Sequence, residues 1–218
     1  AELVFRQNKL PQAELLYRQL LVLEPNSAEV RINLGGVLWR EGKREQAFEQ
    51  YVQAVKSQPA HALAQLNLAN ALLAQNRFSE ATNHYGAARR LRPDLADAAA
   101  GLGRALAAQG QWEEAGSYLA EAARLAPTNA TYQLNLANAC LMSAQTNEAA
   151  AAFAAAARLE PALTGRVLEA ARALAAQGRH QDALANFELA LHLAEASGDH
   201  ALAEAAANGL SASRPGNR

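Results

Sequence analysis

The sequence predicts an all-α fold, a solenoid of antiparallel helix pairs, and three observations carry that prediction. The first is a proline every 34 residues, since a fixed period of this length is typical of a repeat array; the prolines are Pro25, Pro59, Pro93, Pro127 and Pro161. The second is that small and large apolar residues keep one register relative to these prolines. The third is that those residues have helical spacing in both halves of the repeat.

The half of each repeat that precedes the proline is predicted to be a helix with one apolar stripe. Ala47, Tyr51 and Ala54 lie at i, i+4 and i+7, which places them on one face of a helix. The same positions recur as Ala13, Tyr17 and Leu20; Ala81, Tyr85 and Ala88; Ala115, Leu119 and Ala122; Ala149, Phe153 and Ala156; and Ala183, Phe187 and Ala190. The proline then ends the helix, because it cannot continue one and disfavours helix in the residue before it.

The front half of each repeat is predicted to be a second helix, which packs closely on the first. Leu34, Gly35 and Leu38 lie on one helical stripe, and the small residue lets two helices approach each other. A residue suited to the left-handed end of a helix separates the two halves: Asn8, Gly42, Asn76, Gly110 and Gly178. Ala144 is the exception in this series.

At these positions the sequence resembles the tetratricopeptide repeat. That family has Leu-Gly or Leu-Ala on its first helix, and Ala, an aromatic residue and Ala on its second helix before a proline. Two stretches match almost throughout, NLGGVLWREGKREQAFEQYVQAVKSQP and NLANALLAQNRFSEATNHYGAARRLRP. The resemblance covers about residues 1–196 and implies a right-handed superhelical solenoid of about six units, the first truncated. The implied units are about 1–27, 28–61, 62–95, 96–129, 130–163 and 164–198.

The end of the array departs from the pattern in a way that predicts a cap. Glu195 stands where a proline is expected, so the last second helix is predicted to run on to about Gly198. Asp199 is placed to cap a further helix, and a repeat array needs such a terminal cap. We therefore expect the array over residues 1–198, a capping helix over 199–210 and a disordered tail over 211–218. The first repeat begins in mid-helix, so we also expect the chain to have been cut from a longer one.

Composition and charge give no support to several classes of protein. A formal net charge of -1 gives no electrostatic reason to expect nucleic acid or an anionic membrane surface as a partner. No apolar run approaches the roughly 18 residues of a membrane span, and no signal peptide is visible. A single cysteine, Cys140, forms no internal disulfide and reports no redox compartment. We expect a soluble chain and leave cytoplasm and periplasm open.

No constellation of residues indicates catalysis. None of the five histidines has a partner at metal-ligand spacing, so no metal site is predicted. His84, His180 and His192 fall on second helices, where a solvated outer face is the expectation. Cys140 takes a repeated core position held by Leu elsewhere, which favours packing over nucleophilic chemistry. No phosphate-binding loop is present, and we predict no cofactor and no enzyme activity.

The resemblance implies that first helices line a concave groove that receives a peptide or a partner segment. Asn67 and Asn70 are spaced i, i+3, as are Asn135 and Asn138, so each pair faces one way. An amide both donates and accepts hydrogen bonds and therefore suits a peptide backbone. Arginines two repeats apart suit carboxylates through forked hydrogen bonds. The predicted groove residues are Asn33, Asn67, Asn70, Arg104, Asn135, Asn138, Arg172, Trp39 and Arg40.

A structural interpretation of these residues competes with the binding one. The asparagines at the sixth repeat position, such as Asn67, also suit hydrogen bonds to neighbouring backbone. Arg104 and Arg172 also suit ion pairs with acidic neighbours such as Asp97 and Glu169, and Trp39 also suits packing. The family's carboxylate-clamp pattern, which has Lys at the fifth position, is not reproduced: Ile32, Leu66, Ala100, Leu134 and Leu168 stand there.

These features predict a protein–protein interaction scaffold that binds a peptide or partner segment in its groove. An alternative of a different kind is an accessory or assembly module of a larger enzyme or secretion machine, as the truncated first repeat suggests. A third is self-association through the truncated N-terminal edge, which carries apolar residues such as Leu3 and Val4.

Overall fold

The computed structural model describes the backbone of residues 9–213, and the side chains in that range apart from those of residues 146, 161 and 196. The described residues form twelve α-helices and one short 3-10 helix, with no β-strand among them. The predicted all-α class is therefore confirmed. The chain divides into an N-terminal half, residues 1–109, and a C-terminal half, residues 110–218, and we treat each half by itself.

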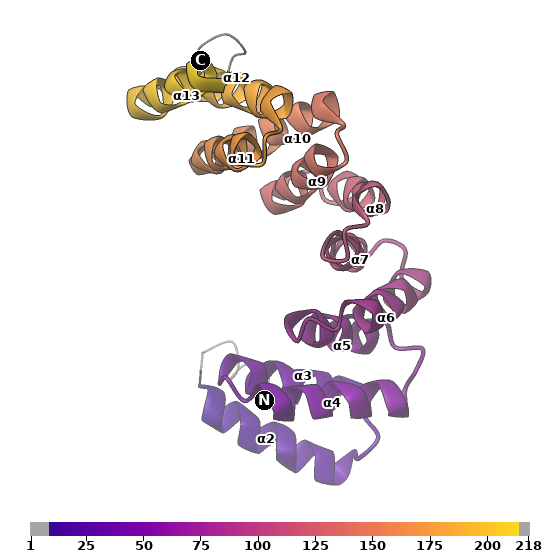
Figure 1. Cartoon of the computed structure of the whole chain (residues 1–218). Helices are drawn as coiled ribbons and strands as arrows, with labels where there is room; N and C mark the ends of the chain where they lie inside the picture. The colour runs from indigo at the N-terminus through magenta and orange to yellow at the C-terminus, as the bar shows by residue number, and fades with distance from the viewer. Residues whose placement is uncertain (1–8, 214–218) are drawn as a thin grey trace. The chain divides into compact units, whose positions relative to one another are not determined.

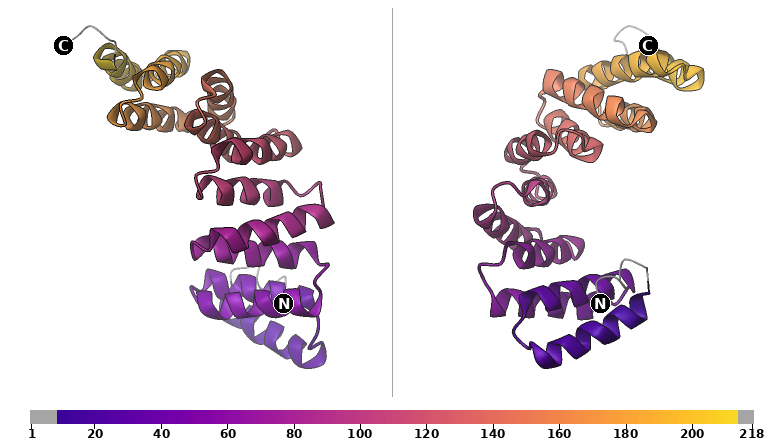
Figure 2. Two further views of the ribbon diagram at one scale, coloured as in Figure 1. Left: turned by 45° about the vertical axis from the view of Figure 1, so that its right-hand side comes forward. Right: turned by 180° about the vertical axis from the view of Figure 1, so that it is seen from behind.

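Each half is a succession of helices in which most neighbours along the chain lie side by side (Figures 1 and 2). The N-terminal half contains α2 (Leu10–Leu23), α3 (Ala28–Arg40), α4 (Arg44–Ser57), α5 (Ala62–Ala74), α6 (Phe78–Leu91) and α7 (Ala96–Ala107). The C-terminal half contains α8 (Trp112–Leu125), α9 (Ala130–Met142), α10 (Thr146–Leu159), the 3-10 helix η1 (Pro161–Leu163), α11 (Thr164–Ala176), α12 (His180–Ser197) and α13 (His200–Ser213).

The predicted helix ends follow from local chemistry. The helices α2, α4, α6, α8 and α10 each stop two residues before one of the periodic prolines. Side chains then cap several of the helices that follow: those of Ser27, His61 and Asn129 accept hydrogen bonds from backbone N–H groups of α3, α5 and α9. Such a cap satisfies an amide that has no partner within the helix.

The turn inside each repeat keeps a left-handed residue even where the sequence offers none suited to it. Gly42, Gly110 and Gly178 have φ between 76° and 80°, and Asn76 has φ 59°. Ala144, expected to be an exception, has φ 63° and so takes the same conformation. A side chain with a Cβ in this region costs about 1–2 kcal/mol, which the packing of the helices on either side offsets. Asn8 lies outside the described residues.

Aromatic rings seated on glycines hold the N-terminal repeats together. Ala13, Ala47 and Ala81 have no exposed surface, as expected of residues where two helices touch. The ring of Tyr51 lies so close to Gly35 that a Cβ there would overlap it, and the ring of Tyr85 lies equally close to Gly101 of α7. The glycines are therefore required by close approach rather than by backbone conformation.

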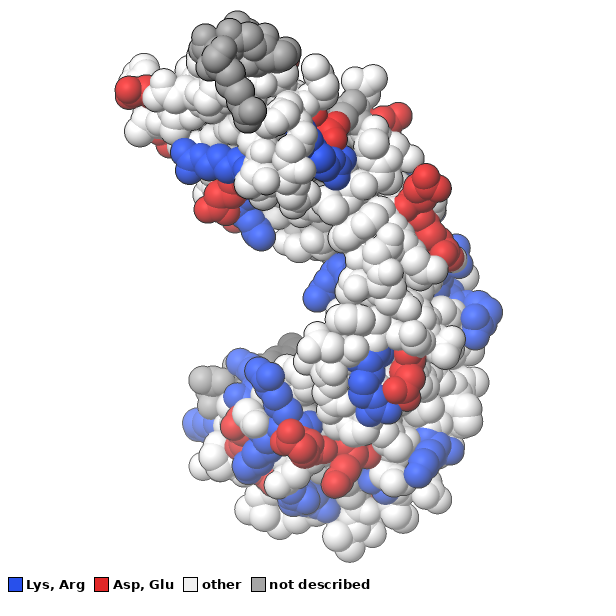
Figure 3. All heavy atoms as spheres, viewed as in Figure 1, with Lys and Arg blue, Asp and Glu red and all other residues white. Residues whose placement is uncertain are grey.

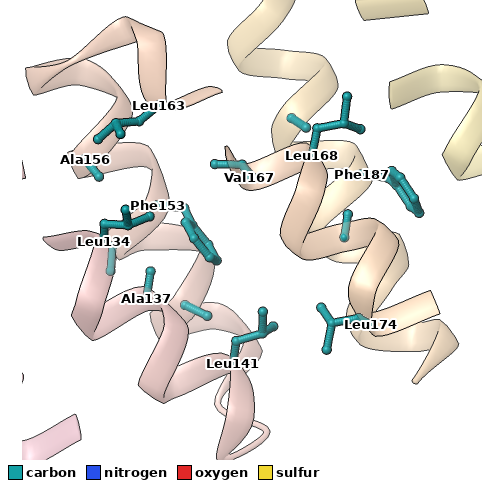
Figure 4. Packing of buried hydrophobic residues seen from close by; sticks show 14 of the residues in the cluster. Leu134, Ala137, Leu141, Phe153, Ala156, Leu163, Val167, Leu168, Leu174 and Phe187 are labelled. Atoms are coloured by element: carbon teal, nitrogen blue, oxygen red, sulfur yellow. The ribbon is translucent and has the colours of Figure 1, made fainter. Parts of the chain in front are cut away.

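The core of the C-terminal half is one continuous cluster of buried apolar side chains. Figure 4 shows Phe153 of α10 and Phe187 of α12 inside it, with leucines and alanines of α9 and α11 around them. Cys140 is 3% exposed within this cluster, in agreement with its predicted packing role. Burial also raises the pKa of its thiol, which disfavours the nucleophilic thiolate.

The C-terminal end differs from prediction in length. Gly198 ends α12 with φ 73°, and the Asp199 carboxylate caps α13 by accepting a hydrogen bond of 3.0 Å from the Leu202 N–H. Helix α13 continues to Ser213, three residues beyond the predicted end at 210, so the first part of the predicted tail is helical. No proline lies between Asp199 and Pro215, and the single glycine in this stretch, Gly209, does not end the helix. Residues 214–218 lie outside the described part of the chain.

Candidate functional site

Two surface cavities in the N-terminal half share Trp39 and Asn70. The smaller, of about 190 Å³, is lined by Trp39, Tyr51, Asn67, Asn70 and Ala71. The larger, of about 420 Å³, is lined by Trp39, Asn70, Leu73, Ala74 and Arg104. We call these residues together the N-terminal groove. Helices α3, α5 and α7 supply most of its wall, and these are the first helices of successive repeats.

Trp39 is fixed in the groove by a cation. The guanidinium of Arg44 lies over its indole ring at 5.5 Å from the ring centre, a cation–π contact that covers part of the ring. The side chain is half-buried and still lines both cavities. The indole is therefore both packed and accessible.

Asn70 is oriented by a hydroxyl from the next helix. The Tyr85 Oη–H donates a hydrogen bond of 2.6 Å to the Asn70 Oδ1. Tyr85 has no exposed surface, and burial raises its pKa to about 12, so the hydroxyl keeps its proton near neutral pH. With its carbonyl oxygen engaged, exposed Asn70 presents the two N–H donors of its amide group.

The other polar members of the smaller cavity differ in what they offer. The Asn67 Nδ2–H donates to the Leu63 carbonyl of its own helix at 2.8 Å, as the structural interpretation of this residue predicts. Tyr51, which the sequence marks only as a packing residue, is 5% exposed and lines the cavity. Among the described residues its hydroxyl has no hydrogen-bond partner, and burial raises its pKa to about 12. The cavity thus holds a protonated hydroxyl as an additional donor.

Arg104 supplies positive charge to the larger cavity. Its side chain is exposed, and no ion pair of Arg104 is found among the described residues. Asn33 is half-buried and Arg40 is exposed, both on α3, and neither lines these two cavities.

The predicted groove residues of the C-terminal half lie on α9 and α11. Asn138 and Arg172 are exposed and Asn135 is half-buried. The position that corresponds to Tyr85 is Phe153, which has no hydroxyl, so Asn138 lacks the contact that orients Asn70. The two asparagine pairs are alike in sequence and different in hydrogen bonding.

A third cavity, of about 420 Å³, lies in the C-terminal half where α8 begins and α9 ends. Its lining residues are Gly110, Gln111, Trp112, Glu113, Glu114, Met142 and Ser143. Glu113 and Glu114 stand in the first turn of α8, where acidic residues favour the start of a helix. The missed signal is the tryptophan beside them, which is half-buried and lines the cavity.

Charge and titratable groups give no sign of a metal or polyanion site. Basic and acidic side chains are interspersed on the face shown in Figure 3. No group of three His, Cys, Asp or Glu side chains suited to a metal ion occurs in the described part of the chain. His84 is not solvated as predicted: it is half-buried, its Nδ1 lies 2.6 Å from the Gln65 Oε1, and burial lowers its pKa. Within residues 9–213, no helix has the length and apolar character of a membrane span.

Comparisons with known proteins agree with this architecture. The family model described as tetratricopeptide repeat matches residues 1–62, 37–81 and 66–130, which together make up more than half of the chain. A search of curated proteins found no significant match.

Solved structures show the same fold at low sequence identity. YrrB, a TPR protein described as having an unusual peptide-binding site, is 21% identical over 88% of this chain and 97% of its own, with a TM-score of 0.68. PilF of Pseudomonas aeruginosa is 20% identical over 98% of this chain and 88% of its own, with a TM-score of 0.72. The first TPR of Spaghetti (RPAP3), bound to an HSP90 peptide, is 23% identical over 54% of this chain and 94% of its own, with a TM-score of 0.52.

Proposed function

The chain belongs to the tetratricopeptide repeat family, and from that membership we propose that it is an interaction scaffold whose N-terminal groove binds an extended peptide segment of a partner protein. The family commonly mediates protein–protein interaction and is generally non-enzymatic. Two of the similar structures are described with a peptide-binding site or a bound peptide. At such low sequence identity the similarity supports only a shared fold. The proposed site is therefore argued from the residues of the N-terminal groove.

The observation that carries the proposal is the hydrogen bond from Tyr85 to Asn70. A buried hydroxyl holds the amide in one orientation, so its donors face outward before any ligand arrives. Preorganisation of this kind lowers the entropy lost on binding. A peptide backbone carbonyl is the acceptor that matches an outward amide N–H.

The rest of the groove narrows the class of peptide. Trp39 offers an aromatic face beside Leu73, which suits an apolar side chain of the ligand. Arg104 at the far wall has no ion-pair partner among the described residues and suits a carboxylate through a forked hydrogen bond. We therefore propose a segment that places an apolar residue near an acidic residue or a free C-terminus.

The assembly module and self-association stay predictions from the sequence. Self-association through Leu3 and Val4 concerns residues outside the described part of the chain. No feature of the described residues favours the accessory-module alternative over the peptide scaffold.

The test is a binding screen with synthetic seven-residue peptides that pair one apolar residue with Asp, with a free C-terminal carboxylate, or with neither. We expect the two carboxylate series to bind, and Arg104→Gln to weaken them about tenfold, which corresponds to about 1.4 kcal/mol. Arg90→Gln removes an exposed arginine of α6 outside the groove and is the matched control. Equal binding of all three series, or equal loss in both variants, would contradict the proposed ligand.

A further inference from the structure

A cation recurs at one position of the repeat, at the start of the second helix, and makes contact with the preceding repeat. This position is occupied by Lys43, Arg77, Gln111, Gln145 and Arg179, each 34 residues apart. We call Lys43, Arg77 and Arg179 the turn cations. The groups that contact each turn cation show which side chains can bind a cation at this position of the repeat.

The three turn cations use carboxylates and polarisable groups. The Lys43 Nζ lies 2.6 Å from a Glu14 carboxylate oxygen of α2, and this contact holds the pKa of Glu14 at about 2. Arg77 lies over the Phe48 ring of α4, 5.3 Å from its centre, and pairs with Glu80 at 2.7 Å. Its guanidinium also donates to the Gln75 side chain at 3.3 Å.

Arg179 follows the same rule in the C-terminal half. It pairs with Asp182 at 2.7 Å, donates to the Leu141 carbonyl, and lies 3.7 Å from the Met142 sulfur of the preceding repeat. Each turn cation therefore combines a carboxylate with a second contact. This contact is an aromatic ring for Arg77, a thioether for Arg179 and a second carboxylate, that of Glu41, for Lys43.

The junction of α8 with α9 lacks such a cation, and it contains side chains of the same chemical kinds, namely an aromatic ring, carboxylates and a thioether. Gln145 stands where an arginine stands in the repeats on α6 and α12, and Gly116 stands where Phe48 stands on α4. A Cβ added at Gly116 would meet nothing within 4 Å. At this same junction lies the cavity of about 420 Å³ lined by Trp112, Glu113, Glu114 and Met142. Ser143, another lining residue, is the repeat equivalent of the Gln75 that contacts Arg77.

We propose that this cavity, which we call the Trp112 cavity, binds an arginine side chain of a partner protein. The partner's guanidinium stacks on the Trp112 indole and pairs with a carboxylate, which are contacts of the same kinds as those that Arg77 makes with Phe48 and Glu80. A planar guanidinium fits both contacts better than an ammonium, because it stacks and forms forked hydrogen bonds.

The charges around the cavity favour this ligand. Two carboxylates line it and no basic residue does. Arg179 reaches Met142 from one side, but its charge is compensated by Asp182. The positive end of the α8 dipole would by itself favour an anion, and Glu113 and Glu114 in the first turn offset it. An anionic ligand would have to lie against both carboxylates.

The experiment uses the full chain carrying Trp39→Phe, so that Trp112 is the remaining tryptophan and its fluorescence reports on the cavity. The probe is acetyl-Gly-Arg-Gly-amide, compared with peptides in which Lys, citrulline or Glu replaces Arg. A single side chain binds weakly, so the titration extends to about 10 mM. We expect saturable binding of the arginine peptide, at least threefold weaker binding of the lysine peptide, and no saturation with citrulline or Glu.

Variants separate the cavity from general charge. The double substitution Glu113→Gln and Glu114→Gln is expected to weaken the arginine peptide at least fivefold, and Met142→Ala at least twofold. Glu45→Gln with Glu188→Gln removes two exposed carboxylates elsewhere and is expected to change binding less than twofold. Far-ultraviolet circular dichroism establishes that each variant is folded. Equal binding of arginine and citrulline, no saturation with arginine, or stronger binding of the Glu peptide would overturn the proposal, whether or not the N-terminal groove binds its own ligand.

Discussion

Asn70 and Asn138 occupy the same repeat position two periods apart, but their side chains differ in hydrogen bonding. Asn70 is tied to a buried tyrosine hydroxyl, whereas the residue in the place of that tyrosine beside Asn138 is Phe153. The repeat fixes where both asparagines stand, because their helices are built from the same apolar pattern. Which atoms of each amide already have a hydrogen-bond partner depends on a second side chain, fifteen residues later. A groove residue in this protein is therefore understood only together with the ring behind it.

The largest expected effect on stability comes from Gly101, against which the Tyr85 ring packs. Gly101→Ala places a Cβ inside the space of the Tyr85 ring, and we expect a loss of about 2 kcal/mol in the free energy of unfolding, since overpacking costs about 1–3 kcal/mol. Urea denaturation measures the change. The matched control is Gly116→Ala, also inside a helix but with open space around the new Cβ. This control should gain up to about 1 kcal/mol from helix propensity. Equal effects of the two substitutions would refute the role of the ring.

A smaller effect is expected from the hydrogen bond itself. Asn70→Ala leaves the Tyr85 hydroxyl buried and unpaired, so we expect a loss of about 1–2 kcal/mol. Asn138→Ala, which strands no such hydroxyl, should change stability by no more than about 0.5 kcal/mol, as for an ordinary surface substitution.

A double-mutant cycle sharpens this comparison. Tyr85→Phe removes the stranded hydroxyl and should restore most of the stability that Asn70→Ala loses. Conversely, Phe153→Tyr gives the C-terminal half the missing hydroxyl, and the Asn138 side-chain amide should then become ordered in NMR relaxation. Additive effects in the cycle would show that the two residues are not coupled.

The smallest expected effect concerns the turns. Ala144→Gly relieves a left-handed alanine, and we expect a gain of about 1 kcal/mol. Asn76→Gly at the equivalent turn of the N-terminal half should gain less, because asparagine tolerates this conformation. Thermal unfolding of the two variants measures the difference, and a larger gain at position 76 would contradict the explanation.

The helices were predictable from the sequence because local rules determine them. The proline period, the alanine and aromatic stripe and the left-handed turn residues each act within a few residues along the chain. Even Ala144 obeys the turn geometry, since the helices on both sides require it. The end of α13 differs from the prediction because Gly209 does not end the helix, and the Phe187 ring packs against that glycine from another helix.

The cavities were less predictable, because they depend on side chains that are far apart in the sequence. Nothing in the pattern says that the Tyr51 ring rests on Gly35 of its own repeat whereas the Tyr85 ring rests on Gly101 of the next. At the junction that holds the Trp112 cavity, Gly116 and Gln145 stand where other repeats have a larger or a charged residue. That absence was visible in the repeat register, but only the positions of Arg77 and Arg179 show what it means.

The last helix has a consequence for the length of the array. Gly209 of α13 receives the Phe187 ring as closely as Gly101 receives the Tyr85 ring. Helix α13 thus receives the aromatic ring of the preceding helix as α7 does, although it lacks the repeat sequence. Because α13 accepts an aromatic ring in the same way as α7, we expect the array to tolerate a change in the number of repeats. Duplication of a 34-residue block ahead of α12 would lengthen the array while leaving α13 packed against the same kind of ring.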